Sequence, residues 1–283
     1  AGAATAIAMG GPGAIFWMWV AAFLGMATIF AEATLAQVFK HKEPDGRVVG
    51  GPAFYIMNGL NCKPLAVFFS VSLIIALGFI GNAVQTNSIA DACNVAFGWN
   101  KLYVGIFLAA LGAYVFFGGI GRIAAITEKL VPVMAAMYLI GGAIILIMNF
   151  TQLPHAFWMI FKGAFNPAAA TGGLIGVSIK QAVRYGVARG LFSNEAGMGS
   201  TPHAHAVAKV KHPCEQGYAA IISVFIDTFC VLNMTAFVIF VTGAIDGHTS
   251  GIALTQKAFS IGLGQLGVPF VALCLFFFAF STV

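Results

Sequence analysis

The chain has 283 residues, of which 60% are hydrophobic and only 8% are charged. A soluble domain carries about 25% charged residues, so this composition excludes an ordinary water-facing shell. The apolar residues lie in long blocks, and a bilayer core of about 30 Å needs about 20 apolar residues in a helix. The composition therefore predicts an all-α polytopic membrane protein. Membrane orientation explains the net charge of +5 better than nucleic-acid binding does, so no nucleic acid is expected as a partner.

The first half of the chain has long apolar blocks behind a short apolar start. Residues 1–9 look like the last turns of a first span, and Gly10-Gly11-Pro12-Gly13 ends them, because glycine and proline interrupt helices. Further spans are expected at about 14–39, 64–90, 102–121 and 130–149. The expected connections are a basic loop from Lys40 to Arg47, a piece at 52–60 that is too short to cross, and a charged loop at 122–129.

The second half is less regular. Residues 150–171 are mixed, with Trp158 and Phe161 beside Lys162, which favours a segment lying at the extracellular membrane interface. A sixth segment starts at Gly172, a seventh span is expected at about 217–243, a mixed connection at 246–262 and an eighth span from about 266. The chain begins with Ala1 and stops soon after an apolar run, so we expect a fragment truncated at both ends.

Lysine and arginine predict the orientation, because positively charged loops stay in the cytoplasm. One set of alternate connections holds Lys40, Lys42, Arg47, Lys63, Arg122, Lys129, Lys209 and Lys211, and the other set holds only Lys101, Lys162 and Lys257. The first set is therefore expected on the cytoplasmic side.

The sixth segment has an unusual composition for a span. Gly190, Gly197 and Gly199 each weaken a helix by about 1 kcal/mol relative to alanine, and Ser193 and Asn194 compete for backbone hydrogen bonds. We expect a helix broken near mid-membrane, which is tolerated only where it lines a cavity or is buried in protein. The free peptide groups of a break attract a carboxylate, an ammonium group or sodium. A packing interface of small residues is the alternative.

Polar residues inside other spans leave two interpretations open. Gln85 either faces the same cavity or makes an interhelical hydrogen bond. Glu32 and Asp227 either carry a proton or a cation, or pair with a base such as Arg189.

Metal and enzyme chemistry find little support. His203 and His205 are two residues apart, so they point away from each other on a helix. The five cysteines form no C-x-x-C pair, so neither a disulfide framework nor a zinc site is expected. No hydrolase or phosphate-binding motif stands out. We therefore expect no enzyme, no catalytic residue and no metal site apart from a coupling ion.

Three strings of residues resemble a known family. They are Gly10-Gly11-Pro12-Gly13-Ala14-Ile15-Phe16-Trp17-Met18-Trp19 with the following Gly25-Met26-Ala27-Thr28 and Phe30-Ala31-Glu32, then Gln85-Thr86-Asn87-Ser88-Ile89-Ala90-Asp91-Ala92, and Arg189-Gly190-Leu191-Phe192-Ser193-Asn194-Glu195-Ala196-Gly197-Met198-Gly199-Ser200. In this order they resemble the alanine or glycine:cation symporter family (sodium:alanine symporters) of the amino acid–polyamine–cation superfamily.

The resemblance implies a fold of two inverted five-helix repeats, with helices one and six broken at the midplane. Residues 1–149 would be the rest of the first repeat, from the end of helix one to helix five. Residues 150–171 would be the extracellular connection. Residues 172–283 would hold helices six to eight, with helix eight incomplete. The family's Gly-Thr-Gly-Asn turn of helix one would lie just before Ala1, and so outside this sequence.

The resemblance also implies a function and a site. It implies a multi-pass transporter of the cell membrane that couples entry of alanine or glycine to sodium by alternating access. A proton-coupled transporter, a channel and a membrane enzyme are the alternatives. No cofactor is expected besides sodium as the coupling ion, and the partners are a small amino acid, sodium and the lipid bilayer. The expected substrate contacts are Gln85, Gly190, Leu191, Phe192, Ser193 and Asn194, and the expected sodium ligands are Ser281 and Thr282.

Overall fold

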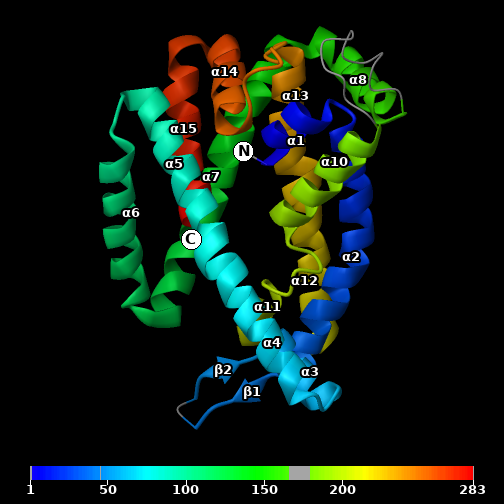
Figure 1. The fold of residues 1–283 in the computed structure, drawn as a ribbon, viewed down its shortest axis with the longest axis vertical. Coiled ribbons are helices and arrows are strands. Elements are labelled where there is room, and N and C mark those ends of the chain that lie inside the picture. The colour runs from blue at the N-terminus through cyan, green and yellow to red at the C-terminus, as the bar shows by residue number, and fades with distance from the viewer. Residues whose placement is uncertain (1, 45, 166–178, 283) are drawn as a thin grey trace.

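The computed structural model describes residues 2–44, 46–165 and 179–282, and these residues are almost entirely helical (Figure 1). Helices long and apolar enough to cross a membrane lie at 14–38, 63–97, 126–148, 213–241 and 251–280. The expected all-α polytopic membrane fold is therefore confirmed. Residues 166–178 lie outside the described part, and with them the end of the expected interfacial segment and the start of the sixth segment.

The N-terminal part begins with two helices joined by a tight turn. Helix α1 (Gly2–Gly10) is followed by the long α2 (Ala14–Val38). Gly11 between them has a φ of 69°, which glycine adopts without the Cβ clash that other residues meet. The basic loop is a short antiparallel hairpin, β1 (His41–Lys42) with β2 (Val48–Val49), in which His41 lies opposite Val49. Helix α3 (Pro52–Gly59) then leads to the next span.

The third span is one continuous helical run of 35 residues. It consists of α4 (Lys63–Leu73), the π-helical η1 (Ile74–Gly81) and α5 (Asn82–Phe97). Such π-helical turns are rare and often occur at functional sites.

The expected charged loop at 122–129 is wrong. Helix α6 (Lys101–Phe116) ends early, and α7 (Gly119–Met148) starts directly after it, so that residues 122–129 are helical. Only Phe117 and Gly118 connect the two helices. No helix breaker lies between Gly121 and Pro132, and charges of both signs do not end a helix as proline or glycine does.

The C-terminal half contains the remaining helices. They are η2 (Phe150–Gln152), α8 (Leu153–Phe165), α10 (Ile179–Asn194), α11 (Pro202–Val207), α12 (Pro213–Phe225), the π-helical η3 (Ile226–Leu232), α13 (Asn233–Val241), α14 (Gly251–Leu263), η4 (Gly264–Leu266) and α15 (Gly267–Phe280).

The connection expected at 246–262 is mostly the helix α14. Its buried residues Ile252, Thr255, Gln256 and Phe259 follow the spacing of one helical face, a signal hidden among its polar residues.

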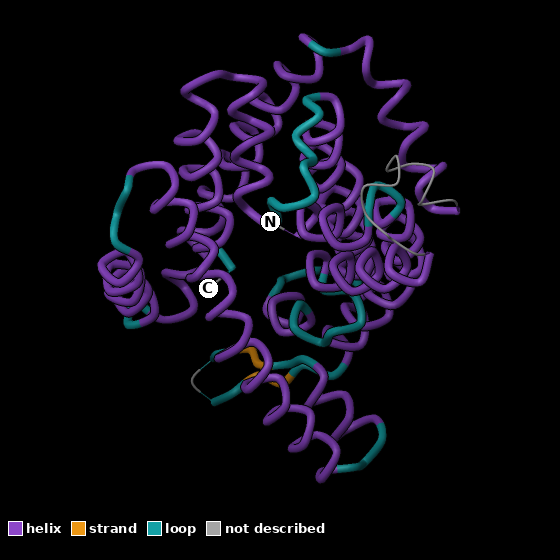
Figure 2. The backbone as a smooth tube through the Cα atoms, turned by 45° about the horizontal axis from the view of Figure 1, so that its top comes forward, coloured by secondary structure: helices purple, strands orange, loops and turns teal. Residues whose placement is uncertain are grey.

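The helices form two groups with the chain ends between them. Figure 1 places α5, α6, α7 and α15 on one side and α1, α2, α10 and α12 on the other, and Figure 2 shows the same arrangement from a second angle. Helix α2 packs against α10 and α12, and α5 packs against α15. At one end of α2, the ring of Phe16 lies 5.7 Å from that of Phe161 and 5.2 Å from that of Phe165, which attaches α8 to this helix.

Small residues bring α10 close to α2. A Cβ added to Gly186 would lie 2.4 Å from the carbonyl oxygen of Ala14, so only glycine permits this approach. A Cβ on Gly190 would meet the Cα of Met18 at 3.4 Å. Close contact of this kind is typical of helix packing in membranes. It fixes α10 along α2, and α10 ends at the site described next.

Candidate functional site

The sixth segment is interrupted, as its composition predicts, but slightly later than Gly190. Helix α10 continues to Asn194 and α11 begins at Pro202, so residues 195–201 separate the two helices. Within this interruption Glu195, Gly197 and Gly199 have φ values of 55°, 84° and 77°, which an α-helix cannot contain. The glycines thus have different structural roles: Gly190 packs on Met18, whereas Gly197 and Gly199 lie in the break with positive φ.

The carboxylate of Glu32 holds the interruption from the side of α2. Its Oε2 accepts a hydrogen bond from the backbone N–H of Gly197 at 3.0 Å. One turn away along the interruption, the side chain of Glu195 bonds to the hydroxyl of Ser200. The Asn194 side-chain oxygen accepts from the N–H of Ala196 at 3.1 Å. The peptide groups that the break frees are thus partly satisfied by side chains, which fixes the shape of the turn.

Helix α2 also holds the far end of α11. The side-chain amide of Gln37, which is 6% exposed, donates to the carbonyls of His205 and, at 2.9 Å, of Ala208. The Lys40 ammonium lies 2.6 Å from the Gln37 side-chain oxygen and 3.3 Å from the Ala208 carbonyl oxygen. These donors satisfy carbonyls at the end of a helix, where a positive charge is also favourable. The sequence analysis missed Gln37, and its only signal was an amide inside an apolar block.

A cavity of about 1100 Å³ lies beside the interruption. It is lined by α1, η1 with α5, the end of α10 with the interruption, η3, α14 and α15. Of the predicted site residues, Gln85, Phe192, Ser193, Ser281 and Thr282 line it. Gly190, Leu191 and Asn194 are not among its described lining residues. Asn194 is instead buried, with its amide 3.4 Å from the hydroxyl oxygen of Thr228.

The two predicted sodium ligands lie at the end of α15. The hydroxyl of Ser281 donates to the carbonyl of Phe278 at 2.9 Å, and that of Thr282 donates to the same carbonyl at 3.0 Å. A hydroxyl that donates its hydrogen keeps its lone pairs, so both oxygens retain the capacity to bind a cation. Thr5 of α1 lines the same cavity.

Asp227 meets Ser193 across the cavity wall. The Ser193 hydroxyl lies 3.1 Å from one carboxylate oxygen of Asp227 and 2.9 Å from the other. Neither Asp227 nor Glu32 forms an ion pair with Arg189 within the described ranges, so the arginine-pair interpretation is wrong for that partner. Both carboxylates instead accept hydrogen bonds from the sixth segment.

A pair of opposite charges stands at another part of the cavity lining. The Lys101 ammonium lies 2.5 Å from the Asp91 carboxylate, and the Asn87 amide donates to the other Asp91 oxygen at 3.0 Å. Lys101 belongs to the set of connections that the charge rule assigns to the outer side. The cavity lining therefore contains charged groups of both signs, and these two are paired with each other.

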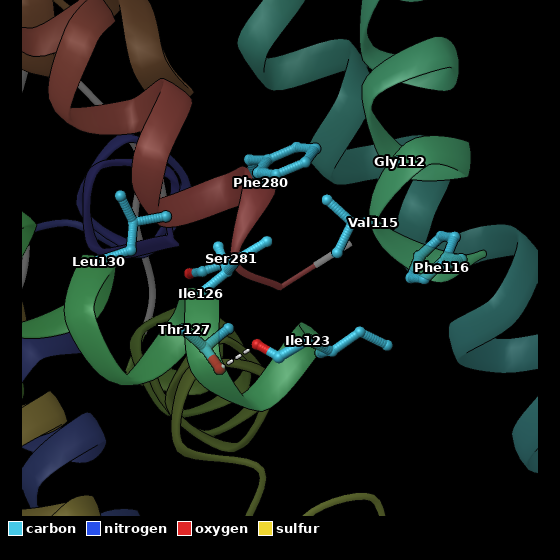
Figure 3. A pocket seen from close by; sticks show the side chains of 9 residues that line it. All are labelled: Gly112, Val115, Phe116, Ile123, Ile126, Thr127, Leu130, Phe280 and Ser281. Carbon is cyan, nitrogen blue, oxygen red and sulfur yellow. Dashed lines mark hydrogen bonds between the residues drawn. The ribbon is translucent and has the colours of Figure 1, made fainter. Parts of the chain in front are cut away.

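A second, smaller pocket lies between α6, α7 and α15 (Figure 3). Its volume is about 50 Å³, far below the roughly 300–1000 Å³ of ordinary ligand sites. Figure 3 shows Ser281 among mostly apolar side chains there, with the Thr127 hydroxyl donating to the carbonyl of Ile123 at 2.8 Å. Ser281 therefore lines both the small pocket and the large cavity.

Metal-binding clusters are absent from the described part of the chain: no group of three or more His, Cys, Asp or Glu residues there could hold a metal ion. The cysteines are free thiols.

Comparison with known proteins places the chain in a family. It matches the sodium:alanine symporter family over residues 1–283. It is 47% identical over its whole length to an uncharacterized transporter of Haemophilus influenzae, of which it covers 59%. It is 46% identical to a putative sodium/proton-dependent alanine carrier protein, YrbD, of Bacillus subtilis, covering 60% of that protein. It is 44% identical to the sodium/alanine symporter AgcS of Methanococcus maripaludis, covering 63%.

In each of these alignments the whole of this chain is matched, so the chain spans about three-fifths of the length of these relatives. With its apolar spans and its interrupted sixth segment beside a large cavity, the chain is a multi-pass membrane protein that belongs to the sodium:alanine symporter family.

Proposed function

We propose that the full-length protein is a secondary active transporter that carries a small neutral amino acid into the cell together with sodium. The observation that carries this proposal is the interruption at 195–201 beside a cavity of about 1100 Å³. A broken helix next to a cavity at membrane depth is the way many secondary transporters form their binding sites. Membership of a symporter family supports the same function.

The substrate contacts proposed here start from Gln85 and the end of α10. Gln85 both donates and accepts hydrogen bonds, so it suits either end of a zwitterion. The last carbonyls of α10, at Phe192 to Asn194, carry the partial negative charge of a helix C-terminus and favour an ammonium group. Gly190 and Leu191 directly precede these residues and are proposed to contact the substrate through their backbone. Together these residues would bind the amino acid between α5 and α10.

The sodium ion in this proposal binds near Ser281 and Thr282. Their hydroxyl oxygens stand at the end of α15 and line the same cavity as the substrate contacts. Coupling requires that each ligand favour the same conformation, and two sites that line one cavity can both act on the conformation of its walls. We also propose that residues 1–149 and 172–283 belong to the two inverted repeats of the transporter, and that the segment 150–171 connects them.

Alanine is the proposed substrate, with glycine as the nearest alternative. Two of the relatives described above are named for alanine, and one of them is named for sodium and protons together. Proton coupling is therefore the second candidate, with Asp227 in the cavity wall as its carboxylate.

The experiment that tests this function uses the full-length protein in proteoliposomes. Labelled alanine uptake is measured with an inward sodium gradient, with an inward proton gradient and with neither. We expect saturable uptake that accumulates alanine only with the sodium gradient. Accumulation with the proton gradient alone would favour the second candidate, and uptake that no gradient drives would contradict both.

A further inference from the structure

The contact between Ser193 and Asp227 has a property that an ordinary hydrogen bond lacks. The Ser193 oxygen is nearly equidistant from the two carboxylate oxygens of Asp227, at 3.1 and 2.9 Å. A serine hydroxyl has one hydrogen to donate and two lone pairs to accept with. Its hydrogen therefore serves either Asp227 or the cavity, but not both. Both residues line the cavity, so the direction of the Ser193 hydroxyl determines whether a ligand in the cavity meets a hydrogen-bond donor or an acceptor there.

The surroundings of Asp227 make its charge state important. A carboxylate inside a membrane is costly and marks a functional site by default. Glu195 in the interruption acts electrostatically on Asp227. Arg189 on α10 and Tyr138 on α7 line the same cavity, and the Glu32 carboxylate on α2 binds Gly197 in the interruption. Among the described residues none of the cations forms an ion pair with Asp227. Its described side-chain partner is the Ser193 hydroxyl.

We infer that Asp227 is a positioning residue whose protonation sets the direction of the Ser193 hydroxyl and thereby the affinity for the amino acid. When Asp227 is ionised, Ser193 donates to it and turns its lone pairs to the cavity, where they accept from the substrate ammonium group. When Asp227 is protonated, its own O–H donates to Ser193, and the serine hydrogen turns into the cavity and opposes the ammonium group. The only chemical change is that Asp227 gains or loses one proton. The substrate exchanges no atom with the protein.

This inference rests on the proposed function, because it takes an amino acid as the ligand of the cavity. It predicts that alanine binds more weakly as the pH falls through the titration of Asp227. Free alanine stays zwitterionic between about pH 5 and pH 8: its carboxyl group titrates well below this window, and its ammonium group, which has a carboxylate and not an amide as its neighbour, titrates above the range of a peptide α-amino group. The pH dependence therefore belongs to the protein.

The test is equilibrium binding of labelled alanine to the purified full-length protein at saturating sodium, from about pH 5 to pH 8. We expect the wild type to lose about tenfold in affinity toward low pH, the size of one charge-assisted hydrogen bond. Asp227→Asn keeps the shape, but its amide donates to Ser193 as the protonated acid does. It should bind weakly at every pH, with a flat profile. Asp246→Asn removes a carboxylate outside the cavity lining and should keep the wild-type profile.

Ser193→Ala and Ser193→Thr decide whether Asp227 acts through the hydroxyl. The Ser193→Ala variant should give a flat pH profile. The Ser193→Thr variant should keep the wild-type profile, because threonine retains the hydroxyl. A melting curve in detergent establishes that each variant is folded. A wild-type profile in Ser193→Ala or in Asp227→Asn would overturn the inference while leaving sodium-dependent alanine binding, and so the proposed function, intact. Absence of alanine binding by the wild type at every pH would overturn both.

Discussion

The carboxylate of Glu32 accepts a hydrogen bond from the backbone N–H of Gly197 at 3.0 Å, which joins the middle of α2 to the interruption in the sixth segment. Further along the same helix, Gln37 donates to the Ala208 carbonyl at the end of α11, and Lys40, which follows the end of α2, donates to the same carbonyl. Helix α2 thus contacts the break and the half-helix that follows it. The shape of the candidate site therefore depends on a helix that contributes no residue to the described cavity lining.

Glu32→Leu removes the acceptor for the Gly197 N–H and should lower alanine uptake roughly tenfold, since a hydrogen bond to a charged group contributes about 1.5–3 kcal/mol. Glu32→Gln keeps an oxygen acceptor and should retain most of the uptake. Initial uptake rates of the full-length protein under an inward sodium gradient measure both. Equal rates for Glu32→Leu and wild type would show that the bond does not shape the site.

Gly199→Ala should destabilise the protein by about 2 kcal/mol or more, because left-handed backbone costs a non-glycine residue roughly 1–2 kcal/mol and overpacking adds to it. Gly199 has a φ of 77°, and its added Cβ would lie 2.6 Å from the ring of Phe69 and 3.0 Å from Pro52. Gly98→Ala is the matched control, with a φ of 68° and no atom within 4 Å of its Cβ. Thermal unfolding in detergent should show a clearly larger loss for Gly199→Ala. Equal losses would mean that the contact with Phe69 adds nothing.

Gln37→Leu should cost about 1–3 kcal/mol, because it leaves the His205 and Ala208 carbonyls without their amide donor. Thermal unfolding of the full-length protein measures the loss. Val38→Ala changes a neighbouring side chain that is 56% exposed and should have little effect. Similar melting temperatures for Gln37→Leu and Val38→Ala would contradict the capping of α11.

The loop before α14 should lose its order in acid. Hydrogen bonds from Lys257 and Thr249 hold the pKa of the Asp246 carboxyl well below its usual range. A lowered pKa in the folded state stabilises the loop above the ordinary value of about 3.9, and this contribution is lost as the pH falls toward the lower folded pKa. Hydrogen exchange at His248 and Thr249, whose N–H groups bond to Asp246, should therefore show constant protection around neutral pH and less in acid. Asp246→Asn should remove this dependence, and an unchanged profile would show that Asp246 is not its origin.

The sequence predicts the spans well where apolar blocks are long. The spans expected at 14–39 and 217–243 compare with helices at 14–38 and 213–241, because a run of that length must cross the bilayer. The sequence fails at 122–129 and 246–262, where charged and polar residues resemble loops but one helical face is buried or no breaker is present.

The break in the sixth segment illustrates the same limit. Its glycines predict an interruption. They do not predict which glycine packs against a neighbouring helix and which adopts the positive φ of the break, because that depends on contacts with Met18 and Phe69 from other helices. The polarity of Gln85 leaves a cavity position and an interhelical hydrogen bond equally open, and the structure places Gln85 in the cavity lining. Ser193 is expected there from the break and the family resemblance. The bond from Gln37 to His205 spans 168 residues, and no local pattern specifies such a partner.

The most direct measurement of the central claim is protection of a cavity residue by substrate. Ser88 lines the cavity and bonds to the Val84 carbonyl at 2.8 Å, and Ser223, exposed on α12, makes the equivalent bond to Ala219 at 3.0 Å. Each is replaced by cysteine in the full-length protein after removal of the native thiols, and the rate of labelling by a water-soluble thiol reagent is measured. We predict that alanine with sodium slows labelling of Ser88→Cys several-fold and leaves Ser223→Cys unchanged. Labelling of Ser88→Cys that alanine and sodium do not change would contradict the account.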